Sequence, residues 1–197
     1  MSISEKDKNI LRDLGKQVAE IATLPDQQET ISLWKAINSL KPVRAMVMID
    51  QIPWHEMDVD GELVLQTENG FCRGLENYLR QTIYAWKHMR VDMVVQPFIS
   101  VHKAIGNTGF GIGVIEETAV TDPRNSVVGH RYIDQFKSED DIMRIQMPQI
   151  SHNEEATKRA EEQAHEIFDG ILEVHTQGAL PGFAPWDLIV MWRSPDH

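Results

Sequence analysis

Apolar side chains recur at helical spacing in two runs within the first 40 residues. Ser4 and Asp7 precede the first run with the spacing of a capping box. Its apolar members lie three or four positions apart: Ile10, Leu11, Leu14, Val18 and Ile21. The second run lies between Pro25 and Pro42 and consists of Leu33, Trp34, Ile37 and Leu40. The pattern predicts two helices, which form a helical N-terminal extension over residues 1–41.

Shorter apolar runs after residue 41 have the length of buried strands. Residues 43–50 and 93–98 are mostly apolar, and a run of helical periodicity from Phe71 to Trp86 separates them. This order of strand, helix and strand is typical of a parallel sheet covered by helices. A further strand is predicted over residues 171–176, after a polar helix over residues 153–168 whose charged face we expect at the surface. The predicted fold class is therefore α/β.

Two further extended runs, 109–115 and 127–133, flank the turn-rich segment 121–126. They predict a β-hairpin insertion over residues 109–133. Ser138 and Asp141 again have capping-box spacing and predict a short helix, and residues 186–192 resume a helical pattern. Neither a linker nor an internal repeat interrupts the chain, so we expect residues 1–197 to form a single domain.

Composition and charge narrow the function classes. The 197 residues carry 19 Lys and Arg against 30 Asp and Glu, a net charge of −11, which would repel a phosphate backbone. We therefore expect no nucleic-acid partner. The single cysteine, Cys72, excludes an intrachain disulfide and favours a reducing compartment. No apolar run has the length of a membrane span, and the polar N-terminus is unlike a signal peptide. We expect a cytoplasmic protein that does not contact membranes.

Polar side chains at the carboxyl ends of the predicted strands are the candidate site, because ligands gather there in α/β sheets. His55 and Glu56 follow the first predicted strand. An imidazole beside a carboxylate can act as a general acid–base pair or bind a metal, so both residues are predicted to be catalytic. The alternative is that the two neighbouring side chains point apart in a solvated loop.

Five further residues near these strand ends are predicted to bind substrate. They are Asp50, Trp54, Gln96, His175 and Gln177. The polar members can hydrogen-bond a ligand, and Trp54 can form a pocket wall. The alternatives are satisfied polar groups at strand ends and, for Trp54, ordinary core packing.

Three other features carry no predicted site. The His55-Glu56 pair does not continue to the second histidine of a helical zinc protease, because position 59 is valine. The glycine-rich stretch 106–113 leads into an extended run and not into a helix, so it does not have the form of a phosphate loop. Cys72 lies near a predicted helix start without a neighbouring base, so we expect a buried structural thiol.

Several segments resemble one known family. They are Lys41-Pro42-Val43, residues 133–142, and residues 174–192 with Gly178, Gly182, Pro185 and Trp186. Together with the order of elements, they resemble the uroporphyrinogen decarboxylase-like family, which includes corrinoid-dependent methyltransferases. The resemblance implies a (β/α)8 TIM-barrel type of fold. Because such a barrel needs about 250 residues, this chain would form a partial barrel, similar to the N-terminal half of a family member.

The departures from the family separate its branches. Residues 50–56 replace the arginine-rich segment with which the decarboxylases hold substrate carboxylates, and this acidic loop would repel a polycarboxylate. The resemblance therefore points to the methyltransferase branch. Porphyrinogen decarboxylation ranks third, after methyl transfer and after binding without catalysis. Zinc and a corrinoid protein partner are implied by the resemblance alone. The His-x-Cys zinc ligands of that branch are absent from the sequence, so no metal ligand is predicted here.

Two functional hypotheses rank above porphyrinogen decarboxylation. The first is methyl transfer to or from a small-molecule substrate, once a C-terminal half or a partner completes the barrel. The second is a catalytically inactive domain that binds a small ligand or a protein partner. An incomplete barrel exposes an apolar strand edge, so we expect either a homo-oligomer or a missing C-terminal half.

Overall fold

The structure, a computed structural model, describes residues 3–120, 128–180, 182 and 184–195. Its contacts divide the chain into two compact units. Unit 1 comprises Met1–Val101 and Lys158–Gln177, and unit 2 comprises His102–Thr157 and Gly178–His197. Among the described residues there are seven helices and three sheets of two strands each, none of them closed. The fold is mixed α/β, while the partial barrel and the single domain over residues 1–197 stay predictions.

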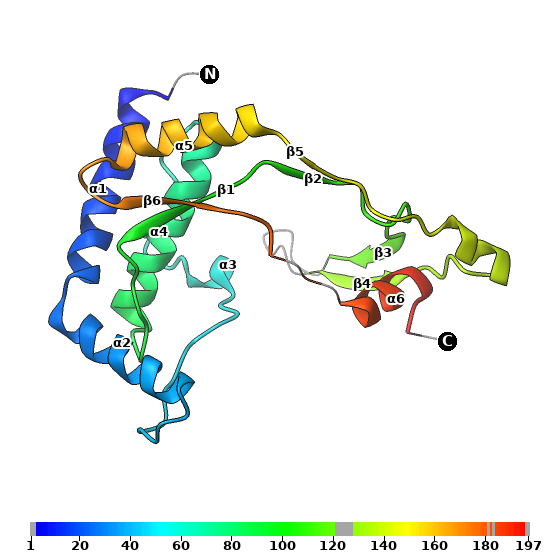
Figure 1. The fold of residues 1–197 in the computed structure, drawn as a ribbon, viewed down its shortest axis with the longest axis horizontal. Coiled ribbons are helices and arrows are strands. Elements are labelled where there is room, and N and C mark those ends of the chain that lie inside the picture. The colour runs from blue at the N-terminus through cyan, green and yellow to red at the C-terminus, as the bar shows by residue number, and fades with distance from the viewer. Residues whose placement is uncertain (1–2, 121–127, 181, 183, 196–197) are drawn as a thin grey trace. The chain divides into compact units, whose positions relative to one another are not determined.

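Helices form most of unit 1 (Figure 1). They are α1 (Glu5–Ala22), α2 (Pro25–Asn38), α3 (Trp54–Met57), α4 (Gly70–His88) and most of α5 (Glu154–Phe168). The Ser4 side chain caps α1 by accepting a hydrogen bond from the Asp7 N–H at 3.1 Å. Asn69 caps α4 in the same way through the Phe71 N–H. The long helices predicted from apolar spacing are confirmed, because their caps and apolar faces are local features of the sequence.

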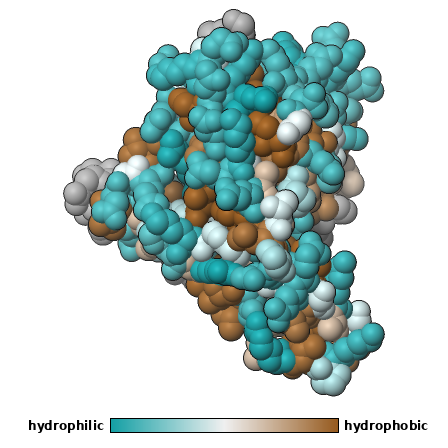
Figure 2. Space-filling model, turned by 90° about the vertical axis from the view of Figure 1, so that its left-hand side faces the viewer, coloured by the Kyte–Doolittle hydropathy of each residue, from teal (hydrophilic) through white to brown (hydrophobic). Residues whose placement is uncertain are grey.

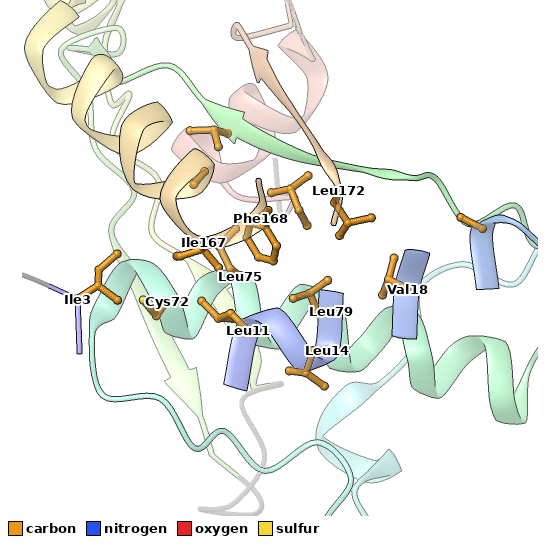
Figure 3. Packing of buried hydrophobic residues seen from close by; sticks show 14 of the residues in the cluster. Ile3, Leu11, Leu14, Val18, Cys72, Leu75, Leu79, Ile167, Phe168 and Leu172 are labelled. Carbon is orange, nitrogen blue, oxygen red and sulfur yellow. The ribbon is translucent and has the colours of Figure 1, made fainter. Parts of the chain in front are cut away.

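The core of unit 1 lies between α1, α4 and the C-terminal end of α5 (Figure 3). Helix α1 packs on α4, and the two helices turn the apolar stripes predicted from their periodicity toward each other. The labelled side chains that meet there include Leu11, Leu14 and Val18 from α1, Cys72, Leu75 and Leu79 from α4, and Ile167 and Phe168 from α5. The first helix of the predicted N-terminal extension is therefore an integral part of the core.

Gly15 permits a close approach of α1 to the end of α5. A Cβ atom at this position would lie 3.1 Å from two ring carbons of Phe168, tighter than ordinary packing. Phe168 is fully buried. Any side chain larger than hydrogen would push the ring aside, so Gly15 and Phe168 fix how closely these two helices pack.

Two buried carboxylates tie the segment before α4 to the helices. Asp7 accepts hydrogen bonds from the N–H groups of Glu68 and Asn69, and the latter lowers its pKa most. Glu76, fully buried, accepts from the N–H groups of Gln66 and Thr67 and pairs with Arg80. Burial raises the pKa of Glu76, but the hydrogen bonds from Thr67 and Gln66 and the contact with Arg80 outweigh it, so the net shift is downward.

The two strands of unit 1 are β1 (Phe98–His102) and β6 (Glu173–Gln177), which pair with each other (Figure 1). The strand predicted over residues 171–176 is confirmed with a shift of boundary. The strand predicted over residues 93–98 is wrong for all but Phe98, because the backbone before it is irregular. There the Val95 N–H donates to the buried Gln27 side chain at 2.7 Å in place of a neighbouring strand.

The first predicted strand, over residues 43–50, is also wrong. The segment has no regular secondary structure, and Val47, Met48 and Ile49 are exposed. Its main anchor is Asp92, whose carboxylate accepts hydrogen bonds from the Val47 N–H and the Arg44 guanidinium. A strand needs a hydrogen-bonded neighbour, and within the described residues none lies beside this segment.

Unit 2 contains two antiparallel pairs and two short helices. Strand β2 (Ile105–Asn107) pairs with β5 (Ile150–His152), and β3 (Glu116–Ala119) pairs with β4 (Gly129–Tyr132). The β3–β4 pair agrees with the predicted hairpin, although its first arm begins after residues 109–115, and the predicted turn at 121–126 lies outside the described residues. The capping box of Ser138 and Asp141 is confirmed and opens a 3-10 helix, η1 (Glu139–Arg144). Helix α6 (Pro185–Arg193) confirms the last helical pattern.

On the face drawn in Figure 2, hydrophilic residues cover most of the area and hydrophobic residues show between them. The charged face predicted for α5 is exposed at Glu154, Glu155, Lys158 and Glu166, while Ala164 and Ile167 on its other face are buried. Among the described helices, none combines the length and apolar character that crossing a membrane requires.

Candidate functional site

An open pocket with a volume of about 730 Å³ lies in unit 1 between α2, α4 and two irregular segments. One segment, residues 48–54, includes the start of α3, and the other, residues 89–96, leads toward β1. The volume is in the range that small-molecule sites occupy. Several lining residues are apolar or aromatic: Ile31, Trp34, Met48, Ile49, Ile52, Trp54, Tyr78, Ala85, Met89, Val91, Met93 and Val94.

Three aromatic side chains give this pocket flat walls. Trp34 on α2 is fixed by a hydrogen bond from its Nε1 to the Asp92 carbonyl oxygen at 2.8 Å. Trp54 packs edge-on against Tyr84, with ring centroids 6.1 Å apart, and the Tyr84 hydroxyl donates to the Met57 carbonyl oxygen. These contacts hold α3 against α4. Tyr78, on the pocket side of α4, is the third aromatic lining residue.

Polar groups around the pocket include several without a partner inside the protein. Among the described residues, no hydrogen bond engages the side chains of Gln96, Asn38 or Lys35, all of which line the pocket. Asp50 accepts only from the N–H of its neighbour Gln51, at 2.7 Å. These side chains can therefore bind a polar group of a ligand without first breaking an internal contact.

Asp92 lines the pocket and anchors residues 43–50 through hydrogen bonds to Arg44 and Val47. Its side-chain hydrogen bond with Arg44, followed by the Val47 N–H, lowers the pKa of Asp92 from 3.8 to about 2. Because Asp92 and Arg44 neutralise each other, the charges left at the pocket are Asp50 and Lys35.

The depressed pKa of Asp92 predicts a loss of stability in acid. A carboxylate with a lowered pKa in the folded state stabilises the protein above its unfolded pKa of 3.8 and loses this effect as the pH falls toward about 2. We expect wild-type protein to be more stable than an Asp92→Asn variant near neutral pH, with the difference shrinking below pH 3.8. Urea unfolding of both proteins across this range measures it. Other acidic groups titrate alike in both proteins, so the pH dependence of the difference in unfolding free energy reports on Asp92. A difference that does not change with pH would contradict the assignment to Asp92.

The structure brings three of the predicted site residues together in this pocket. Asp50, Trp54 and Gln96 all line it. The reason given for selecting them is wrong, however, because none of them follows a strand: Asp50 ends an irregular segment, and Gln96 precedes β1. They meet because residues 48–54 and 89–96 border the same groove.

His55 and Glu56 lie on α3, directly after Trp54. The His55 Nε2 atom is 3.4 Å from Glu56 Oε1, so the two side chains face each other, unlike the alternative in which they point apart. Neither residue belongs to the pocket lining, and no strand precedes them. Their catalytic role stays a prediction.

The other two predicted residues lie elsewhere in unit 1. His175, within β6, stacks on Phe98 with ring centroids 4.3 Å apart, and its Nε2 is 2.9 Å from Glu173 Oε2. It lines a second, more open pocket of about 580 Å³ with Pro97 and residues 169–174. Gln177 is the last residue of β6 and lines neither pocket.

The prediction of site residues from strand ends did not include Trp34 and Tyr78, because both lie on helices. A signal for Tyr78 is present in the sequence: Tyr78, Thr82, Ala85 and Met89 form a second row at helical spacing beside the core row of α4. Such a second row indicates a second face of the helix with a function in packing or binding, and here this face borders the pocket.

The part of the chain that the structure describes assembles no zinc site. Within the residues that are described, no three His, Cys, Asp or Glu side chains are grouped so that they could hold a metal ion. The described residues therefore do not fit the zinc centre that the family resemblance implies. Cys72 is buried as expected; burial, followed by the charges of Asp7 and Glu76, raises the pKa of its thiol to about 11. The thiol is therefore protonated near neutral pH and is a poor nucleophile.

Comparison with known proteins yields no relative: no protein-family model, curated protein or solved structure matches the chain. The resemblance to the uroporphyrinogen decarboxylase-like family therefore stays a prediction.

Proposed function

We propose that the protein binds a small, flat and largely apolar ligand in the pocket between α2 and α4. The observation that carries this proposal is the combination of aromatic walls with the side-chain amide of Gln96, which has no internal hydrogen-bond partner among the described residues. Apolar walls with a few converging polar groups are typical of small-molecule sites. This function corresponds to the ligand-binding hypothesis drawn from the sequence.

Charge narrows the class of ligand. Lys35 is the only cation in the described lining, and Asp50 is the carboxylate left without an ionic partner there. With a net charge of −11, the protein repels polyanions at long range. A neutral aromatic molecule with an amide or hydroxyl group, able to hydrogen-bond Gln96 or Asn38, fits these groups best.

Fluorescence titration with Nile red, a neutral aromatic probe, tests the proposal. We expect saturable binding that weakens about 5- to 30-fold in a Trp54→Ala variant, because the lost aromatic contact is worth about 1–2 kcal/mol. The matched control is Tyr84→Phe. Tyr84 is not a lining residue, and phenylalanine keeps the ring that packs against Trp54 while it removes only the hydrogen bond to Met57, so probe affinity should stay within about twofold.

A Trp186→Ala variant controls for binding to exposed apolar surface, since Trp186 is 76% exposed and lies in unit 2. Probe affinity that falls in the Trp186→Ala variant but not in the Trp54→Ala variant would contradict binding in the pocket.

A second candidate function is methyl transfer on the bound ligand, in keeping with the family that the sequence resembles. The observation that favours it is the His55–Glu56 contact, one residue beyond a pocket wall. Glu56 can orient the imidazole so that His55 exchanges a proton with the ligand. In the transfer tested, the cobalt–carbon bond of methylcobalamin breaks to leave cob(I)alamin, the methyl group bonds to the sulfur of a small thiol, and His55 accepts the thiol proton. If wild-type protein carries out this transfer, we expect a His55→Ala variant to lose about 100-fold in kcat with unchanged Nile red affinity. Equal turnover would remove His55 from the reaction.

A further inference from the structure

Residues 43–50 are an exposed apolar segment without a neighbouring strand. Val47, Met48 and Ile49 are 51%, 69% and 44% exposed. The segment is bracketed by Leu40 and Gln51, which have positive φ, while every residue between them has negative φ and lies outside helix and turn. Such a backbone fits an extended chain, and its Val, Met and Ile residues favour strand pairing.

One edge of this segment is occupied and the other is free. The Val47 N–H donates to Asp92 Oδ2 at 2.8 Å, and the Val47 carbonyl oxygen accepts from the Asp92 N–H at 3.1 Å. In an extended chain the backbone groups of alternate residues point to opposite edges. Asp92 therefore occupies the edge of the odd-numbered residues at Val47, near the middle of the segment. Among the described residues, no hydrogen bond reaches the backbone of the even-numbered residues Arg44, Met46 and Met48.

We propose that residues 43–50 pair in antiparallel with the same residues of a second copy of this chain, about a two-fold axis at Val47. Antiparallel pairing through the free edge matches even-numbered residues with even-numbered residues. Centring at Val47 places Met46 opposite Met48 and Arg44 opposite Asp50, each as a hydrogen-bonded pair. Centring at Met46 would instead place Pro42, which has no N–H, opposite Asp50, and centring at Met48 would extend the pair beyond the bend at Gln51.

Charge complementarity supports a second copy as the partner. In this register each Arg44, already paired with Asp92 of its own copy, lies opposite the partner's Asp50, so the two-fold axis adds a second carboxylate beside each guanidinium. Both Nη atoms of Arg44 contact Asp92, which leaves its Nε for the partner. Asp50 uses one oxygen for the Gln51 N–H and has the other available among the described residues. The pairing would also bring the exposed side chains of the two segments beside one another, and it requires no ligand in the pocket.

Disulfide trapping tests the register. Val47 faces its own copy across the axis in a non-hydrogen-bonded pair, where Cα atoms lie about 4.5 Å apart and a disulfide can form. We expect a Val47→Cys variant to cross-link under mild oxidation at least about tenfold faster than a Met48→Cys variant. The control is stringent because Met48 is the more exposed of the two positions. The native Cys72 is buried and present in both variants.

Sedimentation equilibrium of the full chain tests the pairing itself. We expect a monomer–dimer equilibrium in the micromolar range that a Met48→Pro variant abolishes by removing a donor from the free edge. Equal cross-linking of both cysteine variants, or assemblies larger than a dimer, would overturn the proposed pairing. A wild-type chain that stays monomeric would also overturn the proposed pairing. The free edge would then be open only to a strand of another protein.

Discussion

Replacing Glu76 by alanine is expected to lower the free energy of unfolding by about 3–5 kcal/mol, the range for breaking a buried ion pair by removal of one partner. The Glu76 carboxylate is fully buried and binds Arg80 Nε at 2.7 Å. It also accepts from the Gln66 N–H at 2.9 Å, the Thr67 N–H at 2.8 Å and the Thr67 hydroxyl at 2.7 Å. Removal of the carboxylate leaves these donors and the Arg80 guanidinium without their partner in a dehydrated site.

Urea unfolding followed by circular dichroism measures this change, with Asn77→Ala as the control. Asn77 lies next to Glu76 on α4 but is exposed, so its replacement should change the free energy of unfolding by less than about 0.5 kcal/mol. Equal effects of the two substitutions would mean that Glu76 does not anchor the segment before α4.

Replacing Phe168 by alanine is expected to destabilise the protein by about 3–5 kcal/mol, the cost of emptying a large buried aromatic site. Phe168 is the largest of the fully buried side chains and packs against the backbone of α1 at Gly15. The same unfolding experiment measures the loss. A change below about 1 kcal/mol would contradict the close packing of α1 on the end of α5.

A double-mutant cycle with Gly15→Ala shows whether the effect comes from this contact. When Phe168 is present, the methyl group that Gly15→Ala adds would lie 3.1 Å from the Phe168 ring. This close contact opposes the gain in stability of about 1 kcal/mol that alanine gives over glycine within a helix. In the Phe168→Ala background the obstruction is gone, and Gly15→Ala should stabilise the protein by nearly that full amount.

The helices could be predicted from the sequence because their determinants are local. Apolar spacing defines the faces of α1 and α4, and the Ser4 side chain satisfies a free amide at the start of α1. The strands could not be predicted in the same way, since a strand depends on a partner that is distant in sequence. Residues 43–50 have the composition of a buried strand, yet their main anchor is the Asp92 carboxylate, 45 positions beyond Val47.

The candidate site was predicted in part. Asp50, Trp54 and Gln96 line one pocket, although strand ends do not place them there. Trp34 was assigned to a helix face and not to a site, because apolar periodicity cannot distinguish a residue that packs in a core from one that walls a cavity. His175 is separated from that pocket because β6 pairs with β1 and borders a different groove.

The most direct test of ligand binding uses the five tryptophans as reporters. Trp34 and Trp54 line the pocket. Trp86, on α4, packs under the guanidinium of Arg90, and Trp186 and Trp192 belong to unit 2. We would label the protein with 5-fluorotryptophan and titrate it with 2-naphthamide, a flat neutral amide, in a ¹⁹F NMR experiment. We expect saturable shifts of the Trp34 and Trp54 resonances while the resonances of the other three tryptophans stay in place. Shifts confined to Trp186 and Trp192, or no saturable shift at Trp34 and Trp54, would contradict binding in the pocket.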